Sequence, residues 1–311
     1  MAEPIKWRKK VILAKMEGTY GTDPTPAGAN AMLMTDVSLS PMEGEDVSRE
    51  LERPYLGAQS QFKVGLRAVF NGSTELVGSG AAGTAPAWGV LARACGLAEV
   101  VTPDTSVVYS PVTDDHESVT LYVWIDETLH KIVGCRGTAQ MSVNAQGVPV
   151  IRWSLTGLFA NPTELAQAVP DFTAWQAPKV ATTANTPVFT LGGQAFVMRS
   201  FELDLGNDVQ PRLLIGREEI RIVDRAEQIT ATVEALPLTT FDPFALAVAQ
   251  TPQALALTHG TVAGRIVALA APACELARLT GYENQQDTLE WPLRLTPLPV
   301  DGNDQFTLTL T

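Results

Sequence analysis

Apolar and polar side chains alternate with a period of two along most of this chain, and no other feature constrains the fold as strongly. Such alternation places successive side chains on opposite faces of a half-buried β-strand. The apolar members of two such rows, each expected to share one face of a strand, are Val119, Leu121, Val123 and Ile125, and Phe62, Val64, Leu66, Ala68 and Phe70. The chain is therefore predicted to be mainly β.

Turn and helix signals separate these strands. A turn is predicted at Asp126–Thr128, and a hairpin connection rich in turn-forming residues at Asn144–Pro149. The strongest helix signal covers Thr84–Gly96, with a threonine cap, Pro86 in the first turn and a terminal glycine. One short helix beside many antiparallel strands favours a β-sandwich with a flanking helix.

Length and composition narrow the classes of protein. A chain of 311 residues favours two globular units, and 45% hydrophobic with 18% charged residues excludes a disordered chain. No apolar run reaches the ~18 residues of a spanning helix, and the run Val11–Ala14 is too short for a signal peptide, so we expect no secretory export. A net charge of −12 disfavours nucleic acid as a ligand. The three cysteines are expected to be reduced and buried.

The second half of the chain resembles the first. The segment LMTDVSLS at 33–40 aligns with VMRSFELD at 197–204, and the strand at 64–69 aligns with that at 229–234. Pro86 opens a helix where Pro243 opens a shorter one. We therefore predict an internal duplication, with a first domain at 1–169, a linker at 170–195 and a second domain at 196–311.

A search for catalytic chemistry gives weak candidates only. The histidines are His116, His130 and His259, and none lies in a metal-ligand or catalytic spacing. Asp114 and Asp115 beside His116 could contact a cation, but a solvated turn is the simpler interpretation. The glycines of GSGAAGTAPAWG at 78–89 lack the lysine of a phosphate loop. We expect no catalytic, metal or cofactor site, and no enzyme.

The most unusual segment is the acidic stretch 42–59, which is too long for a simple hairpin loop. Its charges alternate in sign and are followed by apolar side chains, a composition that suits a contact with a neighbouring subunit. The residues predicted to make an inter-subunit or inter-ring contact are Glu45, Arg49, Glu50, Arg53, Pro54, Tyr55 and Leu56.

Five segments in order carry a likeness to a known family: SPMEGEDVSRELERPYLGA, GSGAAGTAPAWGVLARACG, ESVTLYVWID, LHKIVGCRGT and RWSLTGLF. Together they resemble the major tail tube protein of long, flexible-tailed bacteriophages, strongly over 31–162 and weakly beyond. The resemblance implies a β-sandwich with a short flanking helix, whose strands join those of neighbouring subunits into a closed β-barrel. Together with the internal duplication, this predicts two such domains in tandem. Because family rings commonly have six such domains, a chain with two should form a trimeric, pseudo-six-fold ring.

The same resemblance implies the partners and the location. Stacked rings of this chain would form a tube around a tape measure protein, with a tail terminator and distal tail or baseplate proteins at its ends. DNA would pass through as a non-specific, transient passenger, and no membrane would be involved. The protein would be part of the virion tail and would be assembled in the host cytoplasm.

Two other classes of protein remain as alternatives. A phage or cell-surface β-sandwich binding module would require an exposed aromatic cluster or a calcium site. An unrecognised hydrolase would require a cleft that places His116 or His259 beside a nucleophile. Both halves of the chain are acidic, so a channel lined by both is expected to present net negative charge to DNA.

Overall fold

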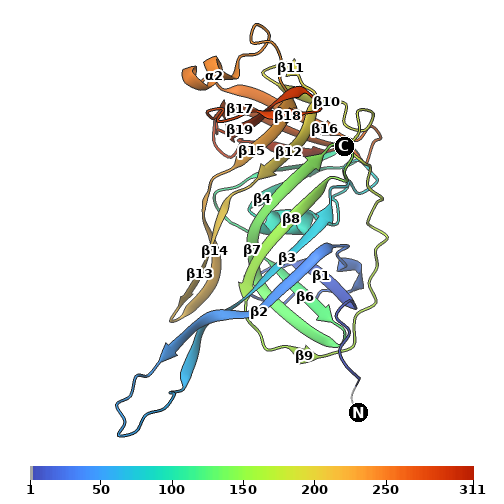
Figure 1. Ribbon diagram of the computed structural model, residues 1–311. Helices are drawn as coiled ribbons and strands as arrows, with labels where there is room; N and C mark the ends of the chain where they lie inside the picture. Colours follow the sequence, from blue (N-terminus) through green and yellow to red (C-terminus); the bar gives the residue numbers. More distant parts are fainter. Residues whose placement is uncertain (1–2) are drawn as a thin grey trace.

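The chain folds mainly into antiparallel strands, as the alternation predicts, and the computed structural model describes residues 3–311 (Figure 1). Up to residue 164 the elements are β1 (Lys10–Met16), a 3-10 turn (Gly28–Asn30), β2 (Thr35–Ser48), β3 (Gln61–Glu75), α1 (Gly89–Ala94), β4 (Leu97–Thr102), β5 (Ser106–Pro111), β6 (Val119–Ile125), β7 (Thr128–Asn144), β8 (Val150–Leu158) and β9 (Thr163–Glu164). The predicted turn between β6 and β7 and the predicted hairpin between β7 and β8 are confirmed.

The remaining elements lie between residues 188 and 310. They are β10 (Val188–Leu191), β11 (Gln194–Ala195), β12 (Met198–Asp204), β13 (Asn207–Leu214), β14 (Arg217–Arg225), β15 (Gln228–Glu234), α2 (Pro243–Ala249), β16 (Gln253–His259), β17 (Val267–Leu276), β18 (Glu283–Gln285), β19 (Thr288–Pro297) and β20 (Thr307–Leu310). The helix predicted at Pro243 is confirmed, and the Asp242 carboxylate accepts bonds from the Phe244 and Ala245 amides at its start.

In the first half, β7 belongs to two sheets. Its beginning pairs with β6 and β9, and β6 pairs with β1. Its end pairs with β8, which pairs with β3, which pairs with β2. The register of β7 against β8 shifts between Val133 and Arg136, where Gly134 has a φ of +63°. This bulge bends the strand from one sheet into the other.

The second half repeats this connectivity. Its strand β17 pairs at its beginning with β16 and β20, and β16 pairs with β10. At its end β17 pairs with β19, which pairs with β15, which pairs with β12. The orders β1-β6-β7-β8-β3-β2 and β10-β16-β17-β19-β15-β12 therefore correspond strand for strand, with a helix before β6 in one and before β16 in the other.

The residue registers of the two halves also correspond. Cys135 in β7 and Cys274 in β17 are both buried, and each Sγ faces the carbonyl oxygen of the residue three places earlier. Two residues after Cys135, Gly137 pairs with Leu155, which pairs with Phe70, which pairs with Leu39. Two residues after Cys274, Leu276 pairs with Leu295, which pairs with Ile229, which pairs with Leu203. Both series end at the residues that the sequence comparison aligns, Leu39 and Leu203.

Two ladders join the halves. The end of β7 pairs with β12, so that the strands β2-β3-β8-β7-β12-β15-β19-β17 form one continuous sheet. The β4–β5 hairpin of the first half pairs through β5 with β20 of the second. Buried side chains from both halves, such as Leu155 and Leu295, belong to one apolar core. The segment expected as a linker, 170–195, contains β10 and β11, and β10 pairs with β16.

Two local expectations differ from the structure. The first helix begins at Gly89 rather than at Thr84, because the residues before it form turns and the buried Trp88 indole is bonded to Val77 O. Among the row from Phe62 to Phe70, only Ala68 and Phe70 are buried. Phe62 and Val64 are exposed because β3 leaves the body of the protein there and enters a long projecting hairpin.

Candidate assembly surface

The continuous sheet ends in two open edges. Among residues 3–311, β2 has no strand partner other than β3, and β18 has none other than β19. Between β17 and β18 the chain from 277 to 282 has no regular structure, although it continues along this edge. Open edges present unpaired backbone donors and acceptors that favour pairing with another strand. Both edges are therefore candidate contacts with other chains.

One face of this sheet is polar. Pleating directs apolar residues such as Phe70, Leu155 and Leu203 into the core, and their neighbours along each strand face away from it. Cross-strand neighbours on the outer face are mainly uncharged polar residues: Ser38, Ser40, Asn71, Ser73, Ser154, Thr138, Gln140, Ser142, Thr230 and Thr232. The charged residues beside them are Glu75, Glu202, Asp204, Arg152 and Arg294.

The charges on the polar face are partly neutralised by one another. An Arg152 Nη1 atom lies 3.9 Å from a Glu202 oxygen and 3.2 Å from the Gln140 side-chain oxygen. Asp204 accepts a bond from the Gly206 amide at 2.9 Å. This face offers no continuous row of cations and therefore no strong phosphate site.

The predicted contact residues lie on the projecting hairpin, which we call the first hairpin and define as residues 41–67 (Figure 1). Glu45 is in β2, opposite Val64, and the others lie in the tip between β2 and β3. The tip is closed by the Gln59 side chain, which accepts from the Leu51 amide and donates to the Leu51 carbonyl at 2.7 and 2.8 Å. Tyr55 is 66% exposed and Leu56 is 102% exposed.

The charged and apolar tip residues make few contacts within the chain. The Arg53 guanidinium lies 6.0 Å from the centre of the Tyr55 ring, a weak cation–π distance. The structure thus brings Arg49, Glu50, Arg53, Pro54, Tyr55 and Leu56 together on one accessible tip. Their contact with a neighbouring subunit stays a prediction.

A second hairpin, formed by β13 and β14 (207–225), was not singled out by the sequence analysis. It corresponds in chain order to the first hairpin, since each lies between matching strands of the two halves. Unlike the first hairpin it is docked on the protein, and Ile220 and Ile222 are buried. The sequence signal that could have located it is the run Val209–Leu214 before Gly216, which alternates in burial.

Hydrogen bonds between side chains of the first half and the Ile220 backbone fix the second hairpin on the first half of the chain. Arg136 donates to the Ile220 carbonyl at 2.9 Å, and the Ile220 amide donates to the Tyr20 hydroxyl at 2.5 Å. Burial raises the pKa of Tyr20 to about 12. Burial likewise lowers the pKa of the Arg136 guanidinium, which lies 4.8 Å from the Tyr20 ring centre.

The base of the second hairpin binds the end of α1. Arg225 donates to the Gly96 carbonyl at 2.7 Å and to the Asn207 side chain at 2.9 Å. The Asn207 amide donates to the carbonyls of Cys95 and Gly137 at 2.7 and 2.9 Å. A cation and an amide of the second hairpin thus bind two carbonyls directly after α1 and one in β7.

The candidate catalytic residues occupy structural positions. His116 is bonded to the Val112 carbonyl at 3.1 Å, and His259 to the Thr186 hydroxyl at 2.9 Å. Burial lowers the pKa of His116, of His130 and of His259. Residues 3–311 contain no group of three or more His, Cys, Asp or Glu side chains that could hold a metal ion. No helix in that range is long and apolar enough to cross a membrane.

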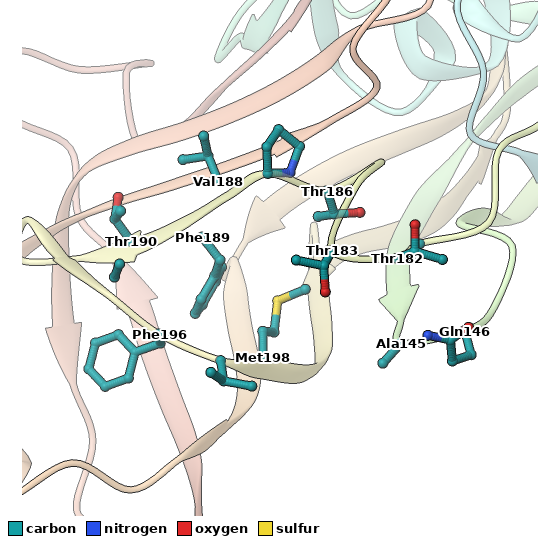
Figure 2. A pocket seen from close by; sticks show the side chains of 14 residues that line it. Ala145, Gln146, Thr182, Thr183, Thr186, Val188, Phe189, Thr190, Phe196 and Met198 are labelled. Atoms are coloured by element: carbon teal, nitrogen blue, oxygen red, sulfur yellow. The ribbon is translucent and has the colours of Figure 1, made fainter.

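The glycine-rich segment packs against another part of the chain. The Gly80 amide donates to the Gly264 carbonyl at 2.9 Å, and a Cβ atom on Gly264 would lie 2.3 Å from the Gly80 carbonyl carbon. A hollow near β10 is lined by threonines and apolar side chains, including Thr183, Phe189 and Met198, and by no ionisable side chain (Figure 2). Neither place presents groups for acid–base or nucleophilic chemistry.

Comparison with known proteins places the chain in a family. No curated protein matches the chain. A family model described as phage tail tube protein matches residues 7–311, which include both halves, both hairpins and both open edges. The chain therefore belongs to the phage tail tube protein family.

Proposed function

We propose that this chain is the structural subunit of the tail tube of a long, flexible-tailed phage. Three copies form a pseudo-six-fold ring, and rings stack into a tube that encloses a channel for DNA. Each chain contributes two tandem domains, at 1–169 and 196–311 with 170–195 between them. In the ring, strands of neighbouring copies join into one β-barrel with the polar sheet face toward the channel.

The observation that carries this proposal is the β7–β12 ladder. Within one chain it joins the last strand of the first four-strand set to the first strand of the second, with Met141 opposite Leu203. The strands that correspond to β12 and β7 are β2 and β17, and these lie at the two open edges. Pairing of β2 in one copy with the β17–β18 edge of the next would repeat the internal junction and leave no open edge.

Two further observations favour a channel. The sheet has one apolar and one polar face, so that closure into a barrel would leave the polar face lining the lumen. The polar face is rich in Ser, Thr, Asn and Gln and carries more carboxylates than guanidiniums. DNA could pass such a lining without the cation contacts that retain it. A tape measure protein would occupy the lumen during assembly, with a tail terminator and distal tail proteins at the ends.

The test is electron microscopy of the purified protein, together with the mass of its smallest ring in solution. We expect rings or tubes of uniform diameter, built from three copies per ring. A chain that stays monomeric at all concentrations and salts would contradict the proposal. A ring of six copies would contradict the pairing of two domains per chain.

A matched pair of variants tests the edge itself. The backbone amides of consecutive strand residues point toward opposite edges, so one of the Leu39 and Ser40 amides points toward β3 and the other toward the open edge. Leu39→Pro removes the donor at residue 39. The neighbouring variant Ser40→Pro removes the amide donor that points toward the opposite edge. Only the variant whose lost amide faces the open edge should abolish rings while leaving the melting temperature of the monomer nearly unchanged.

A further inference from the structure

Each half of the chain carries one of the two long hairpins, but only the second buries its apolar face within the chain, whereas the first approaches the second near its base, at Gly65 and Leu213, and leaves its apolar face exposed. We propose that the first hairpin docks on the second half of a neighbouring copy, around the end of α2, as the second hairpin docks around the end of α1. This inference rests on the proposed ring and assigns the surface that the hairpin covers.

The two helices differ in burial as this proposal requires. In α1, Leu91 and Ala94 are buried. In α2, Val248 is 87% exposed and Phe244 is 37% exposed. Leu91 and Ala94 pack in the apolar core, and the second hairpin approaches the chain just beyond α1, where Ile222 Cδ1 lies 3.3 Å from the position that a Cβ atom would occupy on Gly96. The corresponding surface at α2 has no hairpin on it within the chain.

The two hairpins have similar faces. In the second hairpin, the register partners Pro211 and Ile220, and Val209 and Ile222, form an apolar face that is turned toward the protein. In the first hairpin, Val47 lies opposite Phe62, and Val64 lies two residues beyond Phe62. These three side chains are all exposed. An apolar face of this kind is stable in water only when another surface covers it.

The bases of the hairpins carry matching arginines. Arg225 lies opposite Asn207 and donates to the Gly96 carbonyl, where Gly96 has a φ of +74°. Arg67 lies opposite Glu43 at the same level of the first hairpin. The end of α2 also has a left-handed residue, Gln250 with a φ of +50°. We therefore place Arg67 of one copy at the end of α2 in the next.

Charge favours the same contact. Cys135 and Cys274 occupy corresponding positions in the two halves. The residue after Cys135 is Arg136, which binds the second hairpin, and the residue after Cys274 is Glu275. Within residues 3–311 Glu275 forms no ion pair, and its nearest polar partner is the Gln250 side chain at 3.4 Å. The first hairpin brings Lys63 and Arg67, which within their own chain lie 2.6 Å from Asp46 and 3.6 Å from Glu43. The Glu275 carboxylate near the end of α2 thus complements a hairpin base that carries two cations.

The first experiment measures the protein concentration at half-assembly by light scattering. Phe62→Asp and Arg67→Glu should each raise it by about tenfold or more, with unchanged melting of the monomer. Glu275→Arg should do the same, and Arg67→Glu combined with Glu275→Arg should recover most of the loss. Val223→Asp, on the exposed side of the second hairpin, is the matched control and should assemble as the wild type does.

The second experiment is cross-linking of Arg67→Cys/Gln250→Cys with a short bismaleimide, since the native cysteines are buried. The expected products are covalent dimers and trimers of the chain, and Val223→Cys/Gln250→Cys should give none. Cross-linking within single chains, or wild-type assembly by both Phe62→Asp and Glu275→Arg, would overturn this inference while leaving the ring intact. Failure of the wild type to assemble would instead overturn the proposed function.

Discussion

At the scale of single residues, buried polar groups hold the second hairpin in place. Tyr20 joins it to the first half by accepting from the Ile220 amide and donating to the Gly134 carbonyl at 3.2 Å. Burial disfavours the phenolate and the bond to Gly134 needs the hydroxyl proton, and together these outweigh the Ile220 amide, which by itself would lower the pKa. This residue therefore links the docking of the hairpin to proton binding.

The raised pKa of Tyr20, about 12, predicts alkaline sensitivity. The folded state binds this proton more tightly than the unfolded state, whose tyrosines have a pKa near 10. The stabilisation is therefore fully present below about pH 10 and is lost as the pH rises through about 12. In Tyr20→Phe the free energy of unfolding should fall less steeply over this window. An equally steep fall, measured by urea unfolding at each pH, would contradict the assignment.

Gly264 is predicted to tolerate no side chain. Its φ is +81°, and a Cβ atom would lie 2.3 Å from the Gly80 carbonyl carbon. Gly264→Ala should destabilise the chain by about 2 to 4 kcal/mol, because left-handed strain and the displacement of packed backbone add together. Gly18→Ala, where no atom lies within 4 Å, is the control and should change stability by less than about 1 kcal/mol. Thermal unfolding of both variants checks this.

At the scale of elements, the two hairpins show what sequence patterns can and cannot predict. Alternation located β6, β7 and β8 because their side chains meet one core within the chain. It failed for Phe62 and Val64, because the same alternation also describes a strand whose apolar face has no partner in its own chain. The run Val209–Leu214 predicts a strand of the second hairpin, but its docking depends on bonds between side chains and backbone, such as Arg225 to the Gly96 carbonyl, and such contacts leave no periodic signal.

Deleting Glu45–Leu56 should leave a folded chain that fails to polymerise. The deleted segment lies outside the apolar core, so the melting temperature should change little. Assembly should be lost because the tip and the end of the hairpin would no longer reach a neighbour. Sedimentation of the variant beside the wild type measures this, and tubes formed normally by the variant would count against a role in assembly.

At the scale of the whole molecule, the matching strand orders were partly foreseeable. The alignment of 33–40 with 197–204 agrees with the strand registers, since Leu39 and Leu203 end equivalent series across the two sheets. The β4–β5 hairpin and its pairing with β20 could not be foreseen, because this hairpin has no counterpart in the second half and long-range pairing depends on tertiary contacts. The position of the polar face follows from alternation, but its direction toward a channel depends on assembly.

Assembled tubes should bind DNA negligibly near physiological salt. Two charges about 10 Å apart interact by only about 0.4 kcal/mol in water, so the effect depends on repetition around and along the lining. Replacing Glu202 and Asp204 with lysine should create measurable, salt-sensitive DNA binding, because each copy then adds cations to the polar face. Replacing Asp114 and Asp115 with lysine is the control for added charge outside that face. Equal DNA binding by both double variants would contradict the placement of the channel.

The pairing of β20 with β5 also sets an order of events in time. Leu308 lies opposite Tyr109, so a strand made after every other strand of the fold completes a ladder with a hairpin made far earlier. Contacts between residues so distant in sequence slow folding, and they form after the local hairpins. A nascent chain therefore cannot complete this ladder before β20 has been synthesised. The order of synthesis thus delays the finished subunit, and with it the growth of tubes, until translation has passed β20.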